Sequence, residues 1–88
     1  MNAYAPLQRY LQARDEEQVT LSFDALADIL GHSLPKPARD TAWWTNDPDR
    51  VEAEAWIRAG YHAAFISLAS DSVTFIRVRA AGLTSANV

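Results

Sequence analysis

The sequence predicts a small α+β domain made of three helices, a short strand and a C-terminal β-hairpin. Three segments carry apolar residues at three- and four-residue spacing, which is typical of helices with one buried face. Residues 61–79 are instead rich in aromatic and branched side chains and alternate in polarity, which is typical of strands. The chain has 88 residues and is 49% hydrophobic, so we expect a single domain over 1–88. Its ordered core is expected at about 4–79, followed by a flexible tail at 80–88.

The first helix is expected to start near Pro6, because proline suits the first position of a helix. Residues Tyr4, Leu7 and Leu11 then share one face with the neighbouring Tyr10. Three adjacent acids at 15–17 end the helix, because negative charge is unfavourable at a helix C-terminus.

Residues 19–21 are β-prone and predict a short strand, which leads directly into the second helix. Ser22 is its expected N-cap, and Phe23 and Leu26 begin its apolar face. Gly31 is expected to end this helix, because glycine readily takes the left-handed conformation. Two prolines within 32–39 then predict a stiff connector.

The three tryptophans are the largest apolar side chains of the chain, and all lie within residues 43–56. We expect Trp43, Trp44 and Trp56 to form the structural core, because buried aromatic clusters are the usual use of such residues. The alternative is that one indole stacks on a base or on a partner. The Trp-Trp pair itself fits either a short strand or an irregular turn.

The third helix is expected to have Asn46 or Asp47 as its cap, Pro48 at its first position and Gly60 at its end. On its surface, arginine, glutamate and arginine at positions 50, 54 and 58 have the spacing of a salt-bridge ladder. The hairpin follows, with strands at 61–68 and 73–79 around a turn at 69–72. Arg77 and Arg79 are expected to emerge together near the end of its second strand.

The expected order of elements is compatible with a winged-helix-like domain, in which a three-helix core is edged by a small sheet. In that architecture the third helix can enter a DNA groove and the hairpin can lie along the DNA backbone. An α+β domain with another helix arrangement would give nearly the same order.

Six short motifs are spread over about residues 4–79. They are Leu21-Ser22-Phe23, Ile29-Leu30-Gly31, Leu34-Pro35, Trp43-Trp44-x-Asn46, Ala55-Trp56-Ile57-x-Ala59-Gly60-Tyr61 and Val73-x-Phe75-x-Arg77. Together they resemble a family of small uncharacterised bacterial and phage domains, which occur alone or beside nuclease-type domains. The resemblance implies a common fold unit and brings no established activity.

Catalytic and metal-binding patterns are missing from the sequence. It has no cysteine, and its two histidines, His32 and His62, have no acid at ligand spacing, so we expect no metal site. Its serines have no partnered base, and no glycine-rich phosphate loop is present. We therefore expect a protein that is not an enzyme and has no cofactor.

The N-terminus lacks a basic region followed by an apolar run, and no apolar stretch approaches the roughly 20 residues that span a bilayer. We therefore expect a cytoplasmic protein without a membrane partner. The net charge of −3 lies in residues 1–35, whereas six basic and six acidic residues balance after that point. Any site for a polyanion such as DNA is then a local patch.

The sequence leads to the hypothesis of a non-catalytic nucleic-acid-binding module of regulatory or accessory type. Its expected contact residues are Lys36, Arg39, Asn46, Arg50, Arg58, Arg77 and Arg79. The alternative is a protein-interaction module, because the chain has an acidic first half and many aromatic residues for its size. Such a module would be a homodimer, or a small phage or mobile-element inhibitor that acts through an acidic and aromatic surface.

Overall fold

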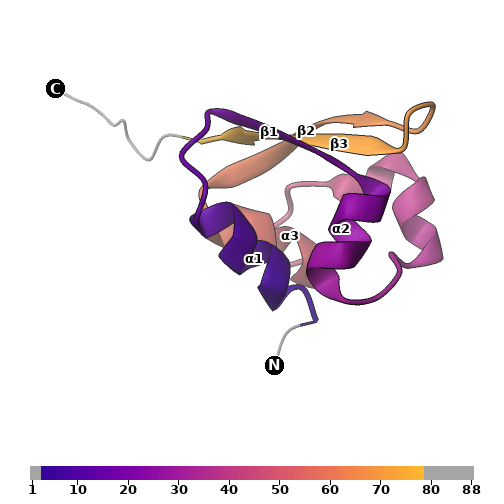
Figure 1. Cartoon of the computed structure of the whole chain (residues 1–88), viewed down its shortest axis with the longest axis horizontal. Coiled ribbons are helices and arrows are strands. Elements are labelled where there is room, and N and C mark those ends of the chain that lie inside the picture. Colours follow the sequence, from indigo (N-terminus) through magenta and orange to yellow (C-terminus); the bar gives the residue numbers. More distant parts are fainter. Residues whose placement is uncertain (1–2, 79–88) are drawn as a thin grey trace, which may run out of the picture.

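The computed structural model describes residues 3–78 and has two layers (Figure 1). Three α-helices lie on one side of a three-stranded antiparallel sheet, and the described chain places no helix on the other side (Figure 1). The elements are α1 Ala5–Gln12, β1 Gln18–Ser22, α2 Phe23–Leu30, the 3₁₀ helices η1 Lys36–Arg39 and η2 Thr41–Trp44, α3 Val51–Arg58, β2 Tyr61–Ser67 and β3 Ser72–Arg77. The predicted α+β class is confirmed. Arg79 and the tail 80–88 lie outside the described residues.

The sheet has the order β1-β3-β2, so the last strand lies in the middle. The predicted hairpin pairs β2 with β3, and β1 adds to the other edge of β3 with Val19 opposite Phe75. Alternate residues of the three strands point toward the helices, as the two-residue period of a strand requires. Those buried on this inner side are Val19, Leu21, Tyr61, Ala63, Val73 and Phe75.

The predicted boundaries of α2 are confirmed. The Ser22 Oγ accepts a hydrogen bond of 3.0 Å from the backbone N–H of Ala25, which satisfies one of the free amides at the helix start. Gly31 ends the helix with φ of 82°, a conformation that costs a side-chain-bearing residue energy. Local chemistry therefore sets both ends of this element.

The expected start of the third helix at Pro48 is wrong, because α3 begins at Val51. Asp47 instead closes a turn before the helix, where its Oδ1 accepts from the Asp49 N–H at 2.9 Å. Arg50 is the N-cap residue and makes no capping bond with its side chain. The expected cap residue, Asn46, is bonded elsewhere.

The tryptophan pair lies in η2, a 3₁₀ helix, so the short strand considered for it is not formed. Trp43, Trp44 and Trp56 are 9%, 3% and 0% exposed, which confirms them as core residues. Trp44 stacks between Phe23, with ring centres 5.8 Å apart, and Trp56, at 5.6 Å. Phe75 joins this cluster from β3, with its ring centre 5.5 Å from that of Trp56. Aromatic contacts therefore join α2, η2, α3 and β3.

Candidate functional site

Asn46 is held by three hydrogen bonds inside the molecule. Its Oδ1 accepts from the Trp56 indole at 2.8 Å and from the Ala63 N–H at 2.9 Å, and its Nδ2 donates to the Ala63 carbonyl at 3.0 Å. The amide oxygen and nitrogen with which an asparagine can bind an adenine base both bond the backbone of β2 here. β2 lies at the edge of the sheet. Asn46 connects the loop before α3 to the sheet and to the core.

The α3 surface carries its positive charges in ion pairs. Arg58 bonds Glu54 at 2.8 Å, as the i, i+4 spacing predicted. Arg50 bonds Glu52 at 3.0 Å instead of Glu54, so the predicted three-residue ladder is wrong. Glu52 is 6% exposed, since the helix turns this side chain inward. Arg50, at the N-cap of α3, and Arg58, in its last turn, are therefore each neutralised by a nearby glutamate.

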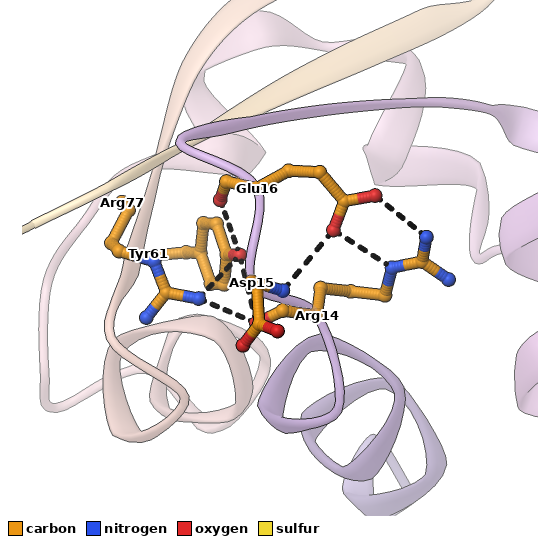
Figure 2. A network of polar contacts seen from close by, with 5 residues as sticks. All are labelled: Arg14, Asp15, Glu16, Tyr61 and Arg77. Carbon is orange, nitrogen blue, oxygen red and sulfur yellow. Dashed lines mark hydrogen bonds and ion pairs between the residues drawn. The ribbon is translucent and has the colours of Figure 1, made fainter.

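Arg77 is part of a polar network at the end of the sheet away from the hairpin turn (Figure 2). Its guanidinium lies 4.8 Å from the centre of the Tyr61 ring, and its Nη2 donates to the Tyr61 hydroxyl at 3.0 Å and to the Arg14 carbonyl. Tyr61 in turn donates to the Glu16 carbonyl at 2.7 Å. The network fastens the loop between α1 and β1 to the base of the hairpin.

An ion pair between Arg14 and Glu16 lies beside this network (Figure 2). Arg14 bonds both carboxylate oxygens of Glu16, at 2.7 and 3.2 Å. These bonds to Arg14, together with backbone hydrogen bonds, lower the pKa of Glu16 to about 2. The carboxylate therefore stays charged in mildly acidic solution.

Lys36 and Arg39 are the two predicted site residues that the fold brings to one cavity. This cavity, here called the α2–η1 groove, has a volume of about 510 Å³ and lies between α2 and the connector with η1. Arg39 also lies 5.3 Å from the centre of the Phe23 ring and forms an ion pair with Asp71 in the hairpin turn. The groove is lined by Phe23, Asp24, Ala27, Ser33, Leu34, Pro35, Lys36, Ala38 and Arg39.

A second exposed feature is the side of the sheet that faces away from the helices, here called the outer sheet face. Three rows of paired residues form it: Gln18, Ile76 and His62; Thr20, Thr74 and Phe65; and Ser22, Ser72 and Ser67. None of these residues is Asp, Glu, Lys or Arg. Phe65 is 66% exposed, although it is one of the largest apolar side chains. A bulge between Ala63 and Phe65 in β2 accompanies this outward placement.

The six predicted nucleic-acid contacts that lie within residues 3–78 are therefore dispersed over the molecule. Arg39 pairs with Asp71 in the hairpin turn and shares the α2–η1 groove with Lys36. Arg77, opposite Tyr61, lies at the other end of the hairpin, and Asn46 is bonded internally. Arg79 lies outside the described residues.

The outer sheet face and the Tyr61 network were not identified from the sequence. For the sheet face a partial signal existed, because the alternation of residues 73–78 places Thr, Ile and Val on one side of the strand. The partner of that face, β1, comes from 54 residues away, as the Thr20–Thr74 bond shows. The Tyr61 network likewise has no sequence signal, because its acceptors are backbone carbonyls.

Within residues 3–78, no group of three or more His, Cys, Asp or Glu residues could hold a metal ion. No helix in the same part of the chain has both the length and the apolar character that crossing a membrane requires.

Comparison with known proteins gives a family and no activity. Neither the curated proteins nor the solved structures include a match to this chain. A family model described as a domain of unknown function (DUF7662) matches residues 4–79. Because this match covers most of the chain, the protein belongs to the DUF7662 family, as its resemblance to small uncharacterised domains predicted.

Proposed function

We propose that this protein is a non-catalytic interaction module, and that its outer sheet face binds a second copy of the same chain. The observation that carries this proposal is the absence of formal charge from a whole face of a chain in which 22% of residues are charged. Charged side chains are depleted in the centre of protein interfaces, where they would lose their hydration.

The net charge of the chain favours this face over the others for self-association. Two copies that each carry −3 repel one another, and the repulsion is least where neither copy presents a charge. The face also presents Phe65, which is 66% exposed, beside the threonine row that ends at Thr20. Two-fold packing of the face on itself would bury both copies of Phe65.

The size of the face sets the expected strength of the dimer. Three strands spaced about 4.8 Å apart and about five residues long give roughly 240 Å² of flat area per copy. Stable complexes bury about 800 Å² of accessible surface per partner. We therefore expect a weak, reversible dimer that forms at high protein concentration.

Substitution of Phe65 by aspartate tests the proposal. The change places one negative charge from each copy in the proposed interface, so we expect Phe65→Asp to remain monomeric where the unsubstituted protein associates. Sedimentation equilibrium over a hundredfold concentration range measures the average mass. Val51→Asp is the matched control, because Val51 is an apolar residue, 53% exposed, at the start of α3. A mass that does not change with concentration, or equal loss of association in both variants, would overturn the proposal.

Nucleic-acid binding by a winged-helix-like domain is a second proposal. It is supported by the element order and by the sheet order β1-β3-β2, which are compatible with that architecture. This proposal takes Lys36 and Arg39, which line the same groove, as its phosphate contacts, with Arg39 exchanging its ion pair with Asp71 for a phosphate. Groove reading by α3 is less favoured, because Asp47, Asp49 and Glu54 lie at or near its start.

This second proposal predicts weak binding that depends strongly on salt. Two phosphate contacts give a slope of about −1.8 in a plot of log affinity against log salt concentration, at about −0.9 per contact. Fluorescence anisotropy with labelled duplex and single-stranded DNA measures the slope. No binding to either DNA at the lowest salt concentration would exclude the proposal.

A further inference from the structure

The α2–η1 groove is a preformed cavity whose lining residues belong neither to the outer sheet face nor to α3. Its volume of about 510 Å³ is within the range of about 300–1,000 Å³ that is usual for ligand sites. Phe23, Leu34 and Ala38 give it apolar walls, and Phe23 and Ala38 are 7% and 1% exposed. An occupant would therefore place an apolar group against the core.

The core holds the walls of the groove in place. Phe23 stacks on Trp44 with an angle of 17° between the rings, and the Trp44 indole donates to the Ala38 carbonyl at 2.9 Å. Pro35 and Pro37 restrict the backbone on the other side. Because these contacts exist before any ligand binds, little ordering would oppose binding.

The charges on the rim decide which class of ligand fits. Arg39 is paired with Asp71, whereas the side chains of Lys36 and Asp24 make no ion pair or hydrogen bond within residues 3–78. Lys36 belongs to η1 and Asp24 to α2, so the rim offers one unpaired cation and one unpaired anion from different elements. The four charges sum to zero, which provides no net attraction for a polyphosphate.

We propose that the α2–η1 groove binds a short peptide segment of a partner protein, with an apolar side chain in the cavity and an acidic residue beside it that pairs with Lys36. A basic residue on the other side of the apolar one then faces Asp24. This ligand matches the apolar walls and both unpaired charges, whereas a nucleic acid would bring its phosphates toward Asp24 and Asp71.

Titration with a designed peptide tests this proposal independently of self-association. The probe is a capped five-residue peptide with leucine at its centre, glutamate on one side and lysine on the other. It is added to isotopically labelled protein while backbone amide signals are followed by NMR. We expect the shifts to be confined to residues 23–39, and we expect a peptide with glutamine in place of glutamate to bind about two- to fivefold more weakly.

Two variants show whether Lys36 is the partner of the acid. Lys36→Gln should bind both peptides as weakly as the unsubstituted protein binds the glutamine peptide. The change in the protein and the change in the peptide remove the same interaction, so their effects on affinity do not add. Arg9→Gln is the matched control, since Arg9 is an exposed cation on α1 and its loss changes the net charge equally. We expect this control to bind like the unsubstituted protein.

Three results would overturn the proposal. They are amide shifts centred outside residues 23–39, an unchanged preference for the glutamate peptide in Lys36→Gln, and stronger shifts of the groove amides with a DNA single strand than with the peptide. The last result would make nucleic acid the occupant. Failure of this site would leave the sedimentation of the protein unchanged, and failure of the dimer would leave the peptide titration unchanged.

Discussion

Replacing Trp56 by alanine is expected to remove a large part of the stability of this domain. The side chain is fully buried, and it contacts the rings of Trp43, Trp44 and Phe75. Truncation of a buried tryptophan to alanine costs about 3–5 kcal/mol, and small domains have a total of about 5–15 kcal/mol. Urea unfolding followed by circular dichroism measures the loss, and a shift of the thermal midpoint of more than about 10 °C should accompany it.

Phe65→Ala is the control for Trp56→Ala, because it also removes an aromatic ring, but one that is 66% exposed. Measured well below the concentration at which the protein associates, it should change the free energy of unfolding by no more than about 0.5 kcal/mol. Equal losses in the two variants would contradict the role given to the tryptophan cluster. Trp56→Phe keeps most of the ring burial and loses the indole N–H. We therefore expect its loss in free energy of unfolding to lie between those of Trp56→Ala and Phe65→Ala.

Replacing Asn46 by alanine is expected to cost about 2–4 kcal/mol, although the side chain is small and only partly buried. The change leaves the Trp56 indole without its acceptor inside the core, and it frees the N–H and C=O of Ala63. An unsatisfied buried polar group costs about 1–3 kcal/mol. Urea unfolding again measures the loss.

Asp47→Ala is the matched control for Asn46→Ala, because Asp47 was the other expected helix cap and bonds only within its own turn. We expect it to cost less than about 1 kcal/mol. The same pair of variants separates a structural role of Asn46 from base reading. An Asn46→Ala protein with unchanged stability and reduced DNA affinity would show that the side chain serves recognition.

Features that depend on neighbouring residues were predicted well. The cap at Ser22, the left-handed Gly31 and the hairpin around 69–72 each arise within a few residues of the chain. The same applies to the Glu54–Arg58 pair, because one helical turn brings the two side chains together. Burial of the tryptophans was also predicted, since large apolar area dominates the free energy of folding.

The candidate sites depended on contacts between distant segments. Residue type alone put Asn46 and Arg77 into a basic recognition surface, and each has an internal partner that the sequence does not reveal. In the case of Asn46, the carbonyl and amide that it bonds belong to Ala63, which is 17 residues away. A polar side chain that satisfies a distant backbone group has the same sequence signature as one that faces a ligand.

The sequence by itself determined the three α-helices, the three strands, most of their ends and the aromatic core, because these follow from local backbone chemistry and apolar burial. It did not predict the two 3₁₀ helices. Only the tertiary structure decided that β3 is the central strand, that one sheet face carries no charge and that Lys36 and Asp24 border one groove. The physical reason is that strand order and the meeting of side chains are set by packing between segments far apart in the chain. Local sequence patterns do not encode that packing.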